Sequence, residues 1–130
     1  TPICFEDAFP YLCRNFVRQG AEMLINLTND SWSKTDSAQI QHFVAARFRS
    51  IENRTVLVRS TNAGVTSVID PHGRLIHSLP YFTEAFLAAS IPVYSSGRSS
   101  FYTRFGDFLP YLCLGLCFAY LVILRLRFSK

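Results

Sequence analysis

The sequence predicts an α/β fold followed by one membrane-spanning helix, and three observations support this prediction. Over the first 94 residues, short apolar runs with the length of buried strands alternate with helical segments. The stretch 108–124 then contains no charged residue. Small polar residues between them are typical of a linker. The chain therefore divides into an α/β body (1–94), a linker (95–107), a transmembrane helix (108–124) and a basic tail (125–130).

The first half of the body predicts two strands and two helices. Residues 2–5 are typical of the end of a strand, and residues 8–19 have helical spacing with Gly20 as the stop. Residues 21–27 predict a short buried strand. Residues 36–54 predict an amphipathic helix capped by Asp36 or Ser37. Its expected core-facing residues are Ile40, Phe43, Val44, Phe48 and Ile51.

The second half of the body reads as a run of strands. We predict strands at 55–60, 64–69, 74–78 and 85–91. Pro71, His72 and Gly73 form the turn before the third of these strands. Strand, helix, strand, helix and then several strands is the order of a layered α/β domain.

The stretch 108–124 is predicted to cross a membrane. At 1.5 Å per residue its length is about 25 Å, near the lower limit for a spanning helix. A buried core helix is the alternative, but the stretch is apolar on every face. It is followed by Arg125, Arg127 and Lys130, and the positive-inside rule places such a tail in the cytoplasm. Residues 1–107 are then expected on the opposite side of the membrane.

Composition excludes several classes of function. The formal net charge is +4, but the basic residues are scattered, so no nucleic-acid partner is expected. The four cysteines form no CxxC pair and have no histidine at zinc spacing, so neither a metal nor a cofactor is predicted. A Cys4–Cys13 disulfide stays open. The chain starts at Thr1 rather than Met, which suggests the C-terminal piece of a longer protein.

Cys4 is the first candidate for chemistry. It lies where a strand is predicted to give way to a helix, and backbone N–H groups there favour a thiolate. Glu6 and Asp7 follow in the first helical turn and oppose that effect. A base or cation from elsewhere would be needed to activate the thiol. The residues alone favour a buried structural cysteine, with Glu6 as an ordinary first-turn residue.

Several motifs together carry a family resemblance. Ile3-Cys4-Phe5-Glu6 resembles the cysteine motif of the nitrilase superfamily of carbon–nitrogen hydrolases. More narrowly, the whole chain is similar to the C-terminal part of the apolipoprotein N-acyltransferase family. Further motifs match that family in order: Asn29-Asp30-Ser31-Trp32, Gln41-His42 with Arg47, Arg49, Glu52 and Arg54, Arg59-Ser60-Thr61-Asn62-Ala63-Gly64, Asp70-Pro71-His72-Gly73, and Tyr102, Arg104, Gly106 and Asp107.

Two positions depart from the pattern of that family. Phe5 stands where the family usually has Tyr, and Ser33-Lys34 where it tends to have Phe-Gly. The role of the tyrosine hydroxyl and the way the loop after Trp32 admits lipid are therefore open in this chain.

The resemblance implies the C-terminal part of a nitrilase-like α-β-β-α sandwich with Cys4 as the nucleophile. It implies that Glu6 supports the site and that backbone N–H groups near Phe5 help to bind the oxyanion. The catalytic Glu and Lys of the family lie upstream of Thr1. Trp32 and Asn62 are candidates for binding substrate, although packing and a tight turn explain them as well.

Other polar residues are expected to be structural. His42 is interpreted as a helix-surface or packing residue, and His72 and His77 as solvated residues. Asp30 fits a cap of its own loop as readily as a place in the site.

The activity implied by the resemblance is acyl transfer. A phospholipid would donate its acyl chain to Cys4, and the resulting thioester would acylate the N-terminal amine of a diacylglyceryl-cysteine lipoprotein. The implied location is the bacterial inner membrane, multi-pass in the parent protein, with residues 1–107 in the periplasm. We expect the 130 residues alone to be inactive. Two alternatives remain: a nitrilase-type amidase and a non-catalytic, membrane-tethered binding module.

Overall fold

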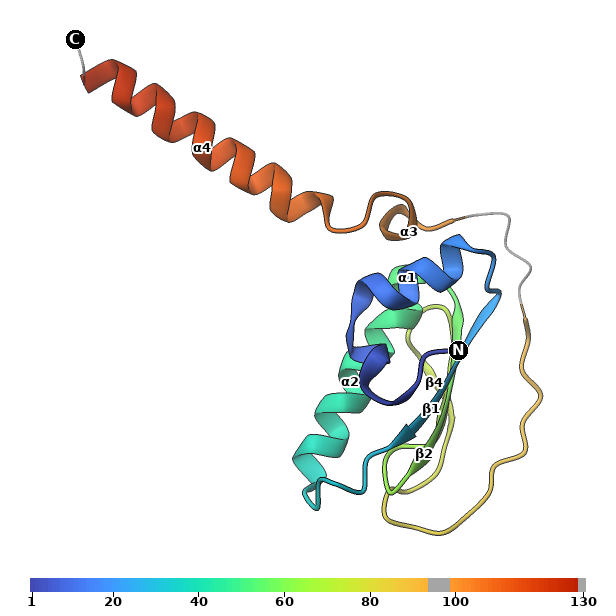
Figure 1. Cartoon of the computed structure of the whole chain (residues 1–130). Helices are drawn as coiled ribbons and strands as arrows, with labels where there is room; N and C mark the ends of the chain where they lie inside the picture. Colours follow the sequence, from blue (N-terminus) through green and yellow to red (C-terminus); the bar gives the residue numbers. More distant parts are fainter. Residues whose placement is uncertain (94–98, 129–130) are drawn as a thin grey trace.

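A four-stranded mixed sheet with helices on one face forms the body of the protein (Figure 1). The structure, a computed structural model, describes residues 1–93 and 99–128. The strands β1 (Met23–Asn29), β2 (Val56–Asn62), β3 (Ser67–Ile69) and β4 (Leu75–Ser78) lie in sequence order. β1 and β2 are parallel, and the other two pairings are antiparallel. The predicted α/β class is confirmed.

Three helical segments cover the sheet and precede or connect its first strands. The 3₁₀ helix η1 (Cys4–Ala8) and the helices α1 (Pro10–Arg18) and α2 (Asp36–Asn53) lie together on one side of the sheet (Figure 1). Just before η1, Ile3 forms a parallel bridge with Leu27, so the chain does pass from extended backbone to helix at Cys4.

The prediction of a strand at 85–91 is wrong. These residues belong to no strand or helix in the structure, and Phe86 is 90% exposed. This segment runs apart from the sheet (Figure 1). A strand needs a hydrogen-bonded neighbour, and an apolar run in the sequence does not supply one. The predicted strand at 64–69 is shortened to β3.

Helix α2 is present, but its predicted buried face is wrong for three of the five residues, while Phe43 does pack against the core. The residues that it buries are mainly polar: Gln39, His42, Ala46, Arg49, Ser50 and Asn53. Ile40, Val44 and Phe48 are each more than 40% exposed. The N-cap is Thr35 rather than Asp36 or Ser37, and it makes no side-chain hydrogen bond. Hydrophobic periodicity fails here because the buried polar groups bind one another across elements.

The apolar core lies between α1, α2 and the sheet. It consists of Cys13, Leu24, Ala46, Leu57 and Ile69, with Phe16, Val17 and Phe43 packed against it. Cys13 from α1 and Ala46 from α2 are both fully buried. This small core is what fixes the two helices on the sheet.

Two helices follow the body. The short helix α3 (Phe101–Phe105) falls within the predicted linker, whose residues 95–98 lie outside the described ranges. Arg14 in α1 fastens α3 to the body, because its guanidinium donates to the backbone carbonyls of Tyr102, Thr103 and Arg104 at 3.0–3.1 Å. The body and the C-terminal segment are therefore joined by specific hydrogen bonds.

The last helix, α4 (Phe108–Phe128), has the properties of a membrane span. It has 21 residues, none of them buried, and a mean hydropathy of 2.0 over its most apolar window. It is long and apolar enough to cross a bilayer. It projects away from the body (Figure 1) and continues through Arg125 and Arg127, beyond the predicted end at 124. Lys130 lies outside the described residues.

Candidate active site

Cys4 lies in a tight turn that is held from both sides. Its φ of 53° is in the left-handed region, which is uncommon for a residue with a side chain. The backbone N–H of Ile3 donates to Oε2 of Glu6 at 2.8 Å, and this closes the turn around Cys4. Asn26, buried on β1, donates from Nδ2 to the Cys4 carbonyl at 2.9 Å. Strained backbone of this kind often occurs at functional sites.

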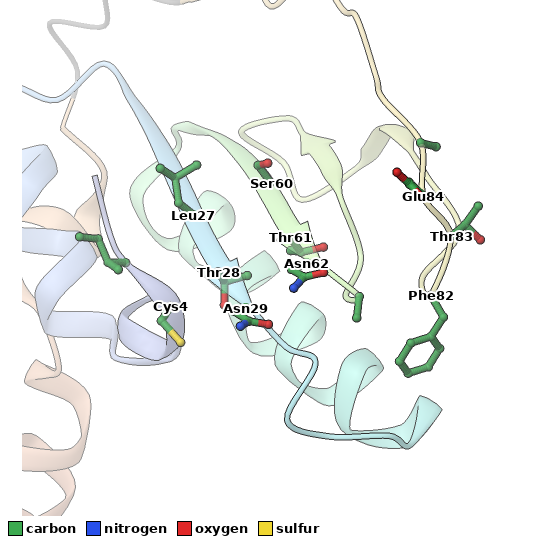
Figure 2. A pocket seen from close by; sticks show the side chains of 13 residues that line it. Cys4, Leu27, Thr28, Asn29, Ser60, Thr61, Asn62, Phe82, Thr83 and Glu84 are labelled. Atoms are coloured by element: carbon green, nitrogen blue, oxygen red, sulfur yellow. The ribbon is translucent and has the colours of Figure 1, made fainter.

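A pocket opens beside Cys4 at the carboxyl ends of the parallel strands. Its volume is about 1010 Å³. Cys4 lies on one wall, the ends of β1 and β2 form the floor, and Phe82, Thr83 and Glu84 lie opposite (Figure 2). Ligands in open α/β sheets bind outside the carboxyl ends of parallel strands. The thiol is half-buried and borders this pocket, so it is accessible to a substrate.

The other predicted site residues are found in different surroundings. Asn62 lines the pocket, and its carbonyl accepts a hydrogen bond from the Asp30 amide at 3.0 Å. Trp32 does not line this pocket; it is 69% exposed on the loop after β1. The Phe5 ring is 48% exposed and packs against the imidazole of His42 at a centroid distance of 4.7 Å. The roles predicted for all of these residues remain predictions.

A buried ionic cluster that the sequence did not predict lies directly behind this turn. His42 in α2 bridges two carboxylates, with Nε2 2.7 Å from Oδ1 of Asp7 and Nδ1 2.8 Å from Oδ1 of Asp30. Arg59 on β2 lies 3.1 Å from Asp7 and 3.7 Å from Asp30. All four residues are at most 5% exposed. We call Asp7, Asp30, His42 and Arg59 the ionic cluster.

Each ring nitrogen of His42 is bonded to a carboxylate oxygen. When both carboxylates are ionised they only accept hydrogen bonds, so both ring nitrogens donate and the ring is an imidazolium. Burial lowers the pKa of His42, but the hydrogen bonds and negative charges of Asp7 and Asp30 outweigh it and leave the pKa above its usual value. Burial also lowers the pKa of Arg59, which remains a cation between two carboxylates. Two negative and two positive charges balance.

The contacts of Arg59 are ion pairs rather than well-aligned hydrogen bonds. Its Nε and Nη2 are close enough to the carboxylates for charge attraction, but their hydrogen-bond geometry is poor. Its Nη1 has no hydrogen-bond partner among residues 1–93 and 99–128. The cluster is therefore bound mainly by charge, and His42 supplies its best-formed hydrogen bonds.

The remaining cysteines differ from Cys4 in their surroundings. All four cysteines are free, so the Cys4–Cys13 pairing that the sequence left open does not form in this structure. Burial raises the pKa of the Cys13 thiol to about 12, and Cys13 belongs to the apolar core. Among residues 1–93 and 99–128 there is no group of side chains that suits a metal ion.

A weak sequence signal for the cluster existed. Asp30, His42 and Arg59 each belong to one of the motifs that carry the family resemblance, and Asp7 follows the cysteine motif directly. The sequence predicts Asp7 as a first-turn helix residue, His42 as a surface or packing residue and Asp30 as a loop cap or a site residue, and it assigns Arg59 no role beyond its motif. Only their juxtaposition shows that they form one unit.

Known proteins share the family and the fold of this chain. The carbon–nitrogen hydrolase family model matches residues 1–98. The chain belongs to the carbon–nitrogen hydrolase family. A solved carbon-nitrogen hydrolase from Helicobacter pylori G27 aligns with a TM-score of 0.52 at 18% identity, over 59% of this chain and 34% of that one. This likeness supports the fold alone.

Within this family, the chain is similar to proteins with one shared name. It is 49% identical over 129 residues to "Apolipoprotein N-acyltransferase 2" of Treponema denticola, covering 99% of this chain and 24% of that protein. It is 52% identical over 119 residues to the protein of the same name in Treponema pallidum, covering 92% and 21%. The predicted resemblance is confirmed. The chain spans about a quarter of the length of these curated relatives.

Proposed function

We propose that this chain carries the nucleophile of a membrane-bound N-acyltransferase that modifies bacterial lipoproteins. The observation that supports this most is Cys4, held at a positive φ at the rim of an open pocket, in a chain that also has an apolar helix able to span a membrane. The similarity to apolipoprotein N-acyltransferases over 99% of the chain supports the reaction class. The remaining catalytic groups, a Glu and a Lys, would come from outside these 130 residues.

The proposed reaction has two covalent steps. The Glu takes the proton from the Cys4 thiol, and the thiolate attacks the carbonyl carbon of a phospholipid acyl ester. The Lys and the backbone N–H groups near Phe5 stabilise the oxyanion. The C–O bond breaks, the lysophospholipid leaves with the proton from the Glu, and a thioester remains on Cys4.

In the second step an amine displaces the thiol. The α-amino group of a diacylglyceryl-cysteine lipoprotein attacks the thioester, its proton passes to the Glu, and Cys4 leaves as the thiolate. The products are an N-acylated lipoprotein and the free enzyme. Glu6, which already closes the turn around Cys4, would keep the nucleophile in place through both steps.

The proposed location follows from the substrates and from α4. Both substrates are embedded in a membrane, so an anchor beside the site keeps the thiol close to them. With α4 crossing the inner membrane, residues 1–107 would lie in the periplasm, and the basic end of α4 at Arg125 and Arg127 would face the cytoplasm. The rest of the parent protein would contribute further spans.

The test uses the full-length protein that contains this chain, purified in detergent. Incubation with a phospholipid labelled in its acyl chain should give a labelled protein whose label is released by neutral hydroxylamine, as for a thioester. Cys4→Ser should abolish this adduct and the acylation of a lipoprotein acceptor. Cys113→Ala, at an exposed position in α4, is the matched control and should retain both. Persistence of adduct and product in Cys4→Ser would refute the mechanism.

The same preparation separates the alternatives. A nitrilase-type amidase would release an amine or ammonia from a soluble amide and would not need α4. A binding module would tolerate Cys4→Ser without loss of function. We also expect no acyl transfer from the isolated 130 residues, because the base and the Lys are absent from them, and turnover by this chain alone would contradict that expectation.

A further inference from the structure

In addition to its hydrogen bond with Asn26, the turn that carries Cys4 contacts the body through one group of buried charges. Phe5 and Asp7, one and three residues after Cys4, both contact His42: Phe5 by its ring and Asp7 by a 2.7 Å hydrogen bond. The other side of the imidazole is bound to Asp30, on the loop that follows β1. Any movement of His42 would therefore be transmitted to the turn around the thiol.

The ionic cluster also contacts the part of the pocket that is formed by the end of β2. The Asp30 amide donates to the carbonyl of Asn62, which lines the pocket, and the carbonyl of Asp30 accepts from Nε2 of Gln39 at 2.8 Å. Arg59, on the strand that ends in Asn62, lies between both carboxylates. The ionic cluster thus connects η1, α2 and the ends of β1 and β2, which are the elements around the pocket.

We propose that the ionic cluster is a positioning device for the Cys4 turn, and that the imidazolium of His42 is the member through which pH controls it. The proposal rests on the proposed role of Cys4 as the nucleophile. The cluster does not touch the reacting atoms, so its residues are positioning residues. Its charge balance is the essential property: a buried carboxylate that loses its cationic partner is strongly destabilised.

The direction of the pH effect follows from the groups around His42. Asp7 from η1, Asp30 from the loop after β1 and Arg59 from β2 are the charged groups that face the ring. The pKa of His42 is raised in the folded protein. The stability that its positive charge gives to the fold is therefore fully present below 6.5, the pKa of histidine in the unfolded chain. It is lost as pH rises through the higher, folded pKa, where the cluster becomes net negative. The turn should therefore loosen on the alkaline side.

The first measurement compares wild type and His42→Gln in the full-length protein across pH. At a pH below the pKa that His42 has in the folded protein, the variant should form the acyl adduct on the order of a hundredfold more slowly than the wild type. A small displacement of a nucleophile can lower a rate by that factor. The phospholipid concentration for half-saturation should change little. As pH rises, the ratio of the two rates should approach one, because wild-type His42 then also lacks its charge. Taking the ratio cancels any pH dependence that both proteins share.

The second measurement is independent of acyl transfer. Alkylation of Cys4 by iodoacetamide, followed by mass spectrometry on the peptide that contains it, should be severalfold faster in His42→Gln at low pH, because the loosened turn exposes the thiol. Cys13, fully buried in the core, should stay protected in the same sample and so shows that the protein is folded. Asp7→Asn removes the carboxylate that most raises the pKa of His42, so it should move the alkaline loss to lower pH.

His77 provides a matched control for the substitution of His42. His77→Gln, at an exposed position of β4, should give wild-type rates at every pH. A ratio that does not change with pH, or Cys4 labelling equal to wild type in a variant with protected Cys13, would overturn the positioning role. Absence of any Cys4 adduct in the wild type would instead refute the proposed function, while the labelling experiment would still decide the role of the cluster.

Discussion

The apolar core and the ionic cluster both contain residues of α2 and β2, yet their chemistry is opposite. Along β1 the buried residues change from Leu24 to Asn26 and Thr28, and along β2 from Leu57 to Arg59. Helix α2 contacts both regions, with Ala46 over the core and His42 over the cluster. Polarity increases towards the carboxyl ends of the strands, where the pocket lies.

The two regions stabilise the protein in different ways. The apolar core binds α1 and α2 to the sheet without directional demands, because burial of apolar surface is non-directional. The ionic cluster depends on charge balance and hydrogen bonds at named atoms, so it fixes one geometry. A core of this kind holds the fold together, and a cluster of this kind can hold a nucleophile in place.

The largest effect should come from breaking the charge balance of the cluster. Arg59→Met leaves Asp7 and Asp30 buried with one cation between them, and we expect a loss of about 3–5 kcal/mol in the free energy of unfolding. Thermal unfolding of the full-length protein in detergent measures it. Arg74→Met, at an exposed position, is the control and should stay near wild type. Equal melting of both variants would show that the cluster adds no stability.

A change in the apolar core should cost stability without affecting the pH response. Leu57→Ala removes a fully buried side chain and should cost about 2–5 kcal/mol through lost burial and a cavity. The dependence of Cys4 alkylation on pH, measured well below the melting temperature, should keep its wild-type shape. An altered pH profile would mean that the two regions are coupled rather than separate.

Gly64 lies against Asp30, so a substitution at this position tests how tightly the ionic cluster is packed. A Cβ at this position would overlap Oδ2 of Asp30, which His42 and Arg59 hold in place. Gly64→Ala should therefore lower stability by about 1–3 kcal/mol, as overpacking does, and slow adduct formation on Cys4. Gly115→Ala in α4, where a Cβ meets no atom within 4 Å, provides the control. Wild-type adduct formation in Gly64→Ala would show that Asp30 can move freely.

The smallest effect should come from Cys13. Cys13→Ala removes one buried sulfur from the apolar core, and we expect a loss of about 1 kcal/mol. The rate of adduct formation should not change, since Cys13 lies in the core and its thiol pKa of about 12 keeps it protonated. Loss of the adduct in this variant would point to a catalytic thiol other than Cys4.

Much of the fold was predictable from local pattern. The buried strand that became β1, helix α2 with the strand after it, and the apolar α4 each follow from runs of residues that are close in sequence. The predicted strand at 85–91 failed, because a strand depends on a neighbour that a local pattern does not contain. The buried face of α2 was also mispredicted, since its exposed residues include Ile40, Val44 and Phe48.

The sequence by itself determined the alternation of strands and helices and the apolar helix at the end, because each depends on neighbouring residues. The resemblance carried by its motifs marked Cys4 as the nucleophile candidate. Only the tertiary structure decided that Asp7, Asp30, His42 and Arg59 form one buried unit behind Cys4. These residues come from four separate segments of the chain. A charged residue is expected at the surface unless an opposite charge meets it in the interior, and that meeting is a property of the fold.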